Sequence, residues 1–319
     1  MSRKYWIDNL KGICLFLIII GHLGQIPDYI KWLLAPTDLL YVGVFFYLSG
    51  LLFNNQKYSY VGFYKSKVRT LLLPYFVISL AVSILDWNLY METSSFLKDT
   101  LISVLMGNGA IKASPLWFVS TLFCANIILK TGWLIKKRWL RNLFFITQPF
   151  ACYLLYDCEI RLPMRIDSAL GASCVMYCAN YMNQIQDKWL HRICLSIACI
   201  WGIAGLYFHC GLLNYKALHS WLSFPSAIGG CLFISEMSQK ILRPKISPLI
   251  WIARNGLIIL GFHCLILFYL DVPLRIFCIT GFMAFMIKLS FVFIILYFVT
   301  LPILSRFHPQ LWGVSCQNK

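Results

Sequence analysis

The sequence predicts an all-α fold in which about ten helices cross a membrane and pack as one bundle. Hydrophobic residues make up 60% of the 319 residues, charged residues only 13%, and the mean hydropathy is +0.72. A soluble domain carries about 25% charged residues, nearly twice that share. The apolar residues occur in repeated runs of about 20, the length of a helix that crosses a bilayer. We therefore expect a single integral, multi-pass domain, 1–319, in the cell (plasma) membrane.

The apolar runs give the expected positions of the spans. These are about 10–27, 38–54, 71–89, 115–130, 143–157, 168–183, 193–209, 219–237, 249–269 and 275–303. An even number of spans puts both termini on one side, and twenty of the 28 lysines and arginines then lie on that side. Because positive charge collects in cytoplasmic loops, both termini are expected in the cytoplasm. Topology thus explains the net charge of +16, and no nucleic-acid partner is expected.

The first span carries the strongest chemical signal. From Leu10 to Leu23 every residue is apolar except Lys11, the glycines and His22. Lys11 and His22 are eleven positions apart, roughly 16 Å along a helix. They share one stripe of that helix, which lies within about 60° of Asp8. A titratable group inside a bilayer is costly, so His22 is expected to be functional.

The second and third spans are expected to flank a basic loop. Gly50, near the end of the second span, is small enough to let another helix approach closely. The loop that follows carries Lys65, Lys67 and Arg69. Pro74 is expected in the first turn of the third span, where its missing N–H costs little.

The longest loop, 86–114, is expected on the outer side. Its amphipathic piece, 96–106, should lie on the membrane surface. Pro115-Leu-Trp117-Phe then leads into the fourth span. On the opposite side, the segment 133–139 has flanking tryptophans and dense positive charge, and is expected to anchor to anionic lipid.

Two further polar residues lie within the last two spans. For His263, in the ninth span, a structural hydrogen bond and a catalytic role both remain open. Lys288 lies near the middle of the tenth span, so it must snorkel, face a polar cavity or mark a break in the helix. The 13 cysteines are scattered singly, which favours packing. No third ligand accompanies the two histidines, so no metal is expected.

Several segments together resemble a known family. They are Ile7-Asp8-Asn-Leu-Lys11-Gly12 with Gly21-His22, Phe45-Phe-Tyr-Leu-Ser49-Gly50, Lys65 through Arg69 to Leu-Pro74-Tyr75, and Pro115-Leu-Trp117-Phe. Their order and spacing are similar to those of acyltransferase family 3, multi-pass membrane O-acyltransferases, and most similar to the stand-alone, fucose-4-O-acetylase-like members. The signature of that family is an arginine, ten residues and a histidine. This chain has Lys11 in the place of the arginine, which keeps the charge but loses the planar fork.

The resemblance implies transfer of an acyl group, usually acetyl, from cytoplasmic acyl-CoA to a hydroxyl of a surface polysaccharide or a lipid-linked glycan precursor. His22 would act as general base or become acylated and relay the group, and Asp8 would orient Lys11. The phosphates of acetyl-CoA would be held by Lys11 together with Lys65, Lys67 and Arg69. The further residues expected to contact substrate or support the site are Trp117, His263 and Lys288.

Two other classes of function remain open. A proton-coupled transporter or flippase of a glycan or small metabolite would use His22, His263 and Lys288 as a proton relay and would need no acyl-CoA. A membrane scaffold would use the same groups only to fix helix packing. The sequence leaves open the acceptor sugar, the size of the acyl group, the leaflet of the acceptor and assembly into a homo-oligomer.

Overall fold

A computed structural model describes residues 4–24, 26–28, 30, 41–86, 93–185, 187–207, 223–306 and 309–312. Within these residues every regular element is a helix and there is no strand, so the expected all-α fold is confirmed. The α-helices are α1 Tyr5–His22, α3 Tyr41–Leu51, α4 Tyr60–Lys67, α5 Leu73–Asp86, α6 Thr93–Leu105, α7 Trp117–Gly132, α8 Arg138–Asp157, α9 Ile166–Met182, α10 Lys188–Tyr207, α11 Ser223–Ile241, α12 Ser247–Arg254, α13 Gly256–Ile276, α14 Gly281–Ile295 and α15 Leu301–Arg306. The short helices are η1 Val68–Leu72, η3 Ile111–Leu116, η4 Pro163–Arg165, η5 Leu296–Thr300 and η6 Pro309–Trp312.

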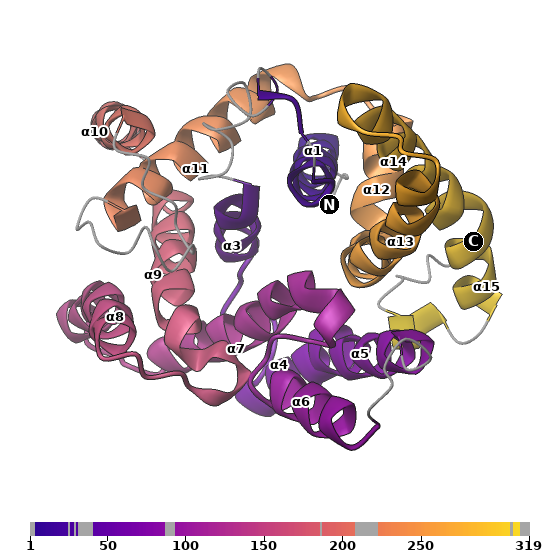
Figure 1. Ribbon diagram of the computed structural model, residues 1–319. Helices are drawn as coiled ribbons and strands as arrows, with labels where there is room; N and C mark the ends of the chain where they lie inside the picture. Colours follow the sequence, from indigo (N-terminus) through magenta and orange to yellow (C-terminus); the bar gives the residue numbers. More distant parts are fainter. Residues whose placement is uncertain are drawn as a thin grey trace.

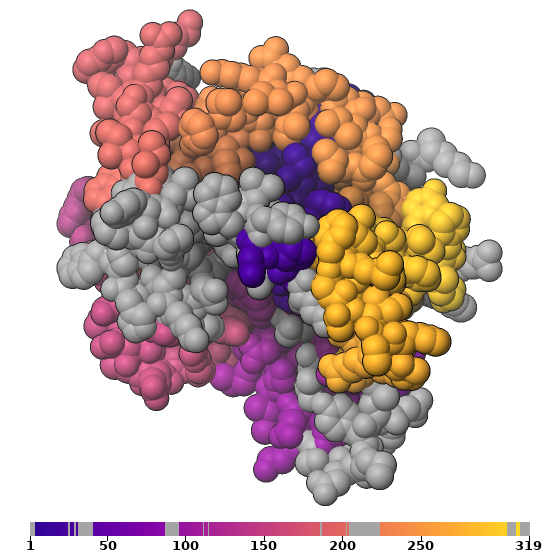
Figure 2. Space-filling view, turned by 45° about the horizontal axis from the view of Figure 1, so that its top comes forward, coloured from indigo at the N-terminus to yellow at the C-terminus, as the bar shows by residue number. Residues whose placement is uncertain are grey.

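The two helices α1 and α3 lie in the middle of the bundle, and the other helices surround them (Figure 1). α1 packs against α3, α11, α12 and α13, while α3 packs against α7, α9 and α11. In the space-filling view, only a small indigo area of these two helices shows between orange α11 and α12 and the gold of α14 (Figure 2). The N-terminal helix is therefore an inner element of the fold, as expected of a segment that carries the strongest chemical signal.

Two side-chain hydrogen bonds and one close backbone crossing fix the start of α1 against α12 and the segment before it. The buried Asn9 side chain donates hydrogen bonds to the carbonyls of Leu242 and Pro244, at 2.8 and 2.7 Å. A Cβ atom on Gly12 would lie 2.3 Å from the Leu249 carbonyl oxygen, so only glycine fits at this crossing. These contacts set the depth and rotation of α1, and hence where its later residues lie.

Gly50 has the role expected for it. A Cβ atom there would lie 2.1 Å from the carbonyl oxygen of Met176, so the backbones of α3 and α9 touch. The Asn180 side chain of α9 donates to the carbonyls of Gly50 and Phe53 just past this contact, at 3.2 and 2.8 Å. The prediction that a small residue lets a second helix approach closely is confirmed.

The segment that carries Lys65, Lys67 and Arg69 is helical, and the expectation of a loop there is wrong. Ser59 accepts the backbone N–H of Gly62 at 3.1 Å, and the chain then stays helical through α4, η1 and α5. Pro74 thus lies inside a long helix. The π turn η1 precedes it, with the Leu73 N–H bonded to the Val68 carbonyl, and this wider turn accommodates a residue without an N–H.

A helix lies at each of the ten expected spans, although several boundaries differ. In the part of the chain that the structure describes, four helices are both long and apolar enough to cross a bilayer, namely Tyr5–His22, Tyr60–Asp86, Gly256–Ile276 and Gly281–Leu304. Two shorter apolar helices are Tyr41–Leu51 and Trp117–Gly132. The expected ninth span breaks at Asn255 between α12 and α13, and the last begins at Gly281 rather than 275. The count of ten crossings and the side of the termini stay predictions.

Candidate active site

His22 is the last residue of α1, and it is exposed rather than buried among its neighbours. Its Nδ1 lies 2.8 Å from the carbonyl oxygen of Ile18, one turn earlier. A carbonyl oxygen can only accept, so Nδ1 carries the proton and donates it. Nε2 of the neutral ring therefore holds a lone pair, which is the form that a general base requires.

His263 of α13 lies beside His22 and has the same arrangement. Its Nδ1 lies 2.8 Å from the carbonyl oxygen of Ile259, so the Nε2 of this ring also carries a lone pair. The centroids of the two imidazole rings are 5.2 Å apart, with 83° between the ring planes. His263 is completely buried, whereas His22 is exposed. The structure therefore brings together the two histidines that the sequence analysis singled out.

Cys264 completes a set of three ligands that the sequence analysis missed. Its Sγ lies 3.4 Å from Nε2 of His263. One potential metal-binding atom each from His22, His263 and Cys264 lie within 4.8 Å of one another. The expectation that no third ligand is available is therefore wrong. Nothing marked Cys264 in the sequence, because it is one of 13 singly scattered cysteines.

Lys288 of α14 is buried close to His22 and forms an ion pair with the partly exposed Asp271. Its Nζ lies 2.5 Å from Oδ1 of Asp271 on α13 and donates to the carbonyl of Leu23 at 3.0 Å. Leu23 directly follows His22, so this lysine joins the end of α1 to α13 and α14. Of the three expectations for Lys288, a polar interior environment is the one that the structure supports. No pattern within the last two apolar runs indicated Asp271 as the partner of Lys288.

The other end of α1 lines a large cavity. This cavity has a volume of about 1360 Å³, and its walls come from the start of α1, from 51–57, from Trp133 and from the end of α9. Its charged lining residues are Lys4, Asp8, Lys11 and Lys57. Asp8 and Lys11 interact electrostatically across one turn of α1. α1 thus has a positively charged cavity at one end and a histidine pair at the other.

A family model described as an acyltransferase domain matches residues 4–306, nearly the whole chain. The chain belongs to acyltransferase family 3. No curated protein and no solved structure matches it. The protein is therefore a membrane acyltransferase, as the resemblance of its motifs implied. The residues that the family model matches include all of α1 and all of α13, the helices that supply the two histidines.

Among the basic residues expected to bind the donor of this acyltransferase, Lys67 interacts electrostatically with Lys11. The two charges are close enough to repel each other, and Lys67 Nζ also lies 5.2 Å from the centroid of the Phe63 ring. Lys65 and Arg69 are exposed and do not line the large cavity. The structure thus groups Lys4, Lys11 and Lys57 at the cavity, with Lys67 nearby.

Lys130 shapes the same cavity although sequence reasoning missed it. This buried side chain of α7 donates to the carbonyl of Asn55 at 2.7 Å, to its Oδ1 at 2.9 Å and to the carbonyl of Tyr58 at 2.9 Å. Three acceptors satisfy the three N–H groups of an ammonium group. The turn 53–58, which forms one wall of the cavity, is therefore fixed to α7.

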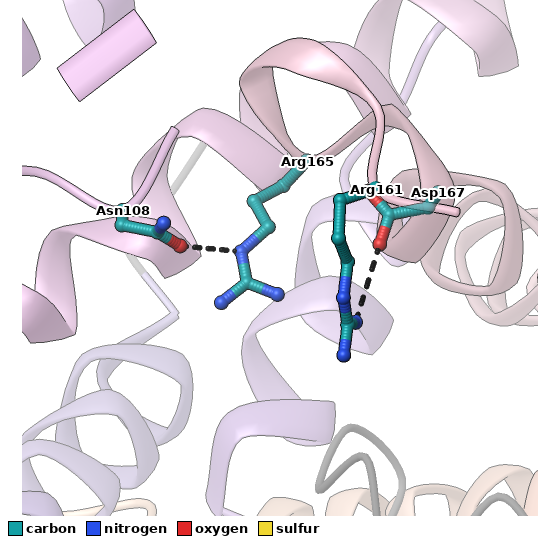
Figure 3. Close-up of polar contacts among 4 residues, drawn as sticks. All are labelled: Asn108, Arg161, Arg165 and Asp167. Carbon is teal, nitrogen blue, oxygen red and sulfur yellow. Dashed lines mark hydrogen bonds and ion pairs between the residues drawn. The ribbon is translucent and has the colours of Figure 1, made fainter. Parts of the chain in front are cut away.

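Trp117 of this acyltransferase lies in a second polar cluster. The guanidinium of Arg165 lies 5.8 Å from the centroid of its ring, and Arg165 Nε donates to Oδ1 of Asn108 at 2.8 Å (Figure 3). Arg161 lies 3.9 Å from Asp167 beside it (Figure 3). Burial lowers the pKa of the Arg165 guanidinium, and the Asp167 carboxylate opposes that shift.

The backbone of this second cluster is strained, since Met164 and Arg165 both have positive φ, at 55° and 57°. Gly107 and Gly109 adopt positive φ opposite them, where glycine carries no penalty. Tyr75 fixes this loop, because its hydroxyl donates to the Val104 carbonyl and accepts the Gly109 N–H. The hydrogen bond to Asn108 then holds the half-buried Arg165 side chain against this loop.

Proposed function

We propose that this acyltransferase moves an acetyl group, or a larger acyl group, from acyl-CoA to a hydroxyl of a surface polysaccharide or of a lipid-linked glycan precursor. One observation carries the proposal. His22, with a lone pair on Nε2, ends a helix whose other end lines a cavity rich in lysine. Acyl-CoA combines an anionic nucleotide with a long pantetheine arm, so it suits a site with these two ends. Membership of the family favours this function over a proton-coupled transporter or a scaffold.

Each step of the proposed reaction is assigned to a residue of the protein or to one of the two substrates. Lys4, Lys11 and Lys57 attract the anionic donor electrostatically toward the large cavity. The pantetheine arm extends along α1, over the roughly 16 Å that separates Lys11 from His22. Nε2 of His22 removes the proton of the acceptor hydroxyl, whose oxygen attacks the thioester carbonyl. The C–O bond forms, the C–S bond breaks, and the proton passes to the leaving CoA thiolate.

A covalent version uses the same residue. Nε2 of His22 attacks the thioester carbonyl first, and the C–S bond breaks to release the CoA thiolate. The acceptor oxygen then attacks the acyl group and the N–C bond breaks. The hydroxyl proton passes through Nε2 of His22 to the CoA thiolate. Brief incubation of the purified protein with labelled acetyl-CoA and no acceptor separates the two versions. Label that stays on the wild-type protein but not on a His22→Gln variant indicates the covalent route, and an unlabelled protein that turns over with acceptor indicates the general base.

The proposed function is tested with the His22→Gln variant. Loss of a general base lowers the rate by about 10² to 10⁴, so release of free CoA in the presence of glycan acceptor should fall at least a hundredfold. The matched control is His191→Gln, since His191 pairs with Glu236 at 3.6 Å away from the histidine pair. Mass spectrometry of surface glycans should show one acetyl group fewer in cells with His22→Gln. Wild-type O-acetylation by this variant would overturn the proposal.

A further inference from the structure

A second cavity of about 390 Å³ adjoins the large one and has a different lining. The two cavities share Trp133 and Gln184 as a common wall. The other polar and aromatic residues of the smaller cavity are Arg138, Arg141, Tyr177, Tyr181 and Asp187. A volume of 300–1,000 Å³ with aromatic walls and a few charged groups is typical of small-molecule sites.

The donors in this wall outnumber the acceptors. The guanidinium of Arg141 lies 4.2 Å from the ring centroid of Trp133, and its Nη1 donates to the Ile135 carbonyl at 3.2 Å. The Arg141 Nε and the Trp133 Nε1 are both buried, and neither has an acceptor among the described residues. A buried donor without a partner costs about 1–3 kcal/mol. A bound anion could accept hydrogen bonds from these two donors, and would therefore stabilise this wall of the cavity.

The remaining residues leave this positive charge uncompensated. Arg138 Nη2 donates to the Tyr181 hydroxyl at 2.6 Å, and its guanidinium lies 5.3 Å from the centroid of that ring. The carboxylate of Asp187 accepts the backbone N–H groups of Trp189 and Leu190, at 2.8 and 3.3 Å. Its charge is thus directed at the start of α10, where the helix dipole favours an anion.

The aromatic rings are held in place by contacts outside the cavity. Tyr177 stacks on Phe145 with centroids 4.1 Å apart and 12° between the planes. Its hydroxyl donates to Oδ1 of Asn142 at 2.6 Å. Rigid rings beside arginine side chains are the usual means by which proteins bind a nucleobase next to a phosphate.

We propose that this smaller cavity binds the nucleotide end of the acyl-CoA donor. Arg138 and Arg141 contact its phosphate groups, and the base lies against the ring of Tyr181. The pantetheine arm passes Trp133 and Gln184 into the large cavity and continues toward His22. This inference rests on the proposed function, and it assigns the donor phosphates to two arginines rather than to the expected set of Lys11, Lys65, Lys67 and Arg69.

The first test measures binding of a fragment and needs no acyl transfer. The full-length protein in nanodiscs of neutral phosphatidylcholine is titrated with adenosine 3′,5′-bisphosphate by calorimetry. Arg138→Gln and Arg141→Gln should each weaken binding by about tenfold or more, because a hydrogen bond to a charged group is worth about 1.5–3 kcal/mol. Arg243→Gln is the matched control, since Arg243 is exposed and contacts only the Gln239 carbonyl among the described residues.

The second test measures the acyl-transfer kinetics of the same variants. KM for acetyl-CoA should rise with kcat unchanged, because these residues bind the non-reacting end of the donor. KM for acetyl-dephospho-CoA should change less. Arg138 is exposed, so its variant keeps the test valid even if Arg141→Gln unfolds.

Each outcome bears on the inference separately from the proposed function. Wild-type fragment binding by both arginine variants would overturn the inference even if transfer occurs. Arginine-dependent fragment binding without any transfer would uphold the inference and contradict the proposed function. The same phosphate chemistry occurs in lipid headgroups, so the titration is repeated in nanodiscs with anionic phosphatidylglycerol. Similar affinity in both lipids supports the inference, whereas complete loss of fragment binding in phosphatidylglycerol, with no recovery at high fragment concentration, would assign the cavity to lipid headgroups and overturn it.

Discussion

Both membrane histidines use their Nδ1–H within their own helix, and this determines their chemistry. Each ring is fixed by a carbonyl one turn earlier, at 2.8 Å in both cases. That bond selects the tautomer with a lone pair on Nε2, which can take a proton, attack an acyl group or bind a metal. The same hydrogen bond is found on histidines that bind metal ions. The pair with Cys264 should therefore be sensitive to soft divalent metals.

We predict that Zn²⁺ inhibits acyl transfer by occupying the lone pair of His22. Ring nitrogens and thiolates are the preferred ligands of Zn²⁺, and His22, His263 and Cys264 offer three of them. Cys264→Ala removes one ligand and should raise the Zn²⁺ concentration for half-inhibition by about tenfold, a loss of about 1.4 kcal/mol of binding. CoA release measured against Zn²⁺ concentration checks this. Cys199→Ala is the control, and equal sensitivity of both variants would show that Zn²⁺ acts elsewhere.

The sequence was sufficient to find the residues that are costly in a membrane, but not their partners. His22, His263, Lys11 and Lys288 stand out because each is polar inside an apolar run. Cys264 does not stand out, because it lies close to His22 only as a result of how α13 packs against α1. Asp271, Lys130 and Arg141 were missed for the same reason. Their partners lie on other helices, and periodicity within one helix carries no information about them.

At the level of helices, the Lys288–Asp271 pair joins three elements at the end of α1. We predict that Lys288→Met destabilises the protein by about 1–3 kcal/mol, because the buried Leu23 carbonyl and the partly exposed Asp271 carboxylate both lose their donor. The double variant with Asp271→Leu should be more stable than the sum of the two single changes. Thermal unfolding of all four proteins in detergent gives this coupling energy. Strictly additive losses would mean that the pair contributes nothing to the joint.

The crossing of α3 and α9 gives a second prediction at this scale. Gly50→Ala places a Cβ atom 2.1 Å from the Met176 carbonyl oxygen, so one backbone must move. Overpacking of this kind costs about 1–3 kcal/mol. Gly21→Ala is the matched control, because its Cβ would lie 3.7 Å from the Tyr41 hydroxyl, an ordinary contact. The unfolding midpoint should fall for the first variant alone, and equal midpoints would contradict the described crossing.

Helix positions were easier to predict than helix ends. Apolar runs locate a helix at each expected span, whereas the charges of 65–69 suggested a loop in what is a continuous helix. Lysine and arginine are good helix formers, and Ser59 supplies the cap that starts this helix six residues before Lys65. The break at Asn255 falls on the pair Asn255-Gly256, which is typical of a turn, but the long apolar run around it favoured one continuous helix.

At the scale of the whole molecule, the lysine-rich cavity and the histidine pair lie at opposite ends of α1. The large cavity lies at the start of this helix, with Lys4, Lys11 and Lys57 in its walls, and the smaller cavity with Arg138 and Arg141 adjoins the large one. The histidine pair lies toward the other end of α1. An acyl group that enters at the cavities must therefore cross much of the bundle to reach His22. This arrangement suits a donor on one side of the membrane and an acceptor that meets the histidines deep within it.

The proposed function requires the lysine-rich cavity to face the side of the membrane on which acyl-CoA occurs. We predict that the start of α1 and the turn before α8 face the cytoplasm, because positive charge collects there and acyl-CoA is a cytoplasmic metabolite. A short protease site is inserted between Lys136 and Lys137 in one full-length variant, and between Cys158 and Glu159 in another, both in exposed turns. Protease added to intact cells should cleave only the second variant, and permeabilised cells should yield both cleavages. The reverse pattern would place the lysine-rich cavity outside, where no acyl-CoA is available, and would remove the basis of the proposed function together with the expected topology.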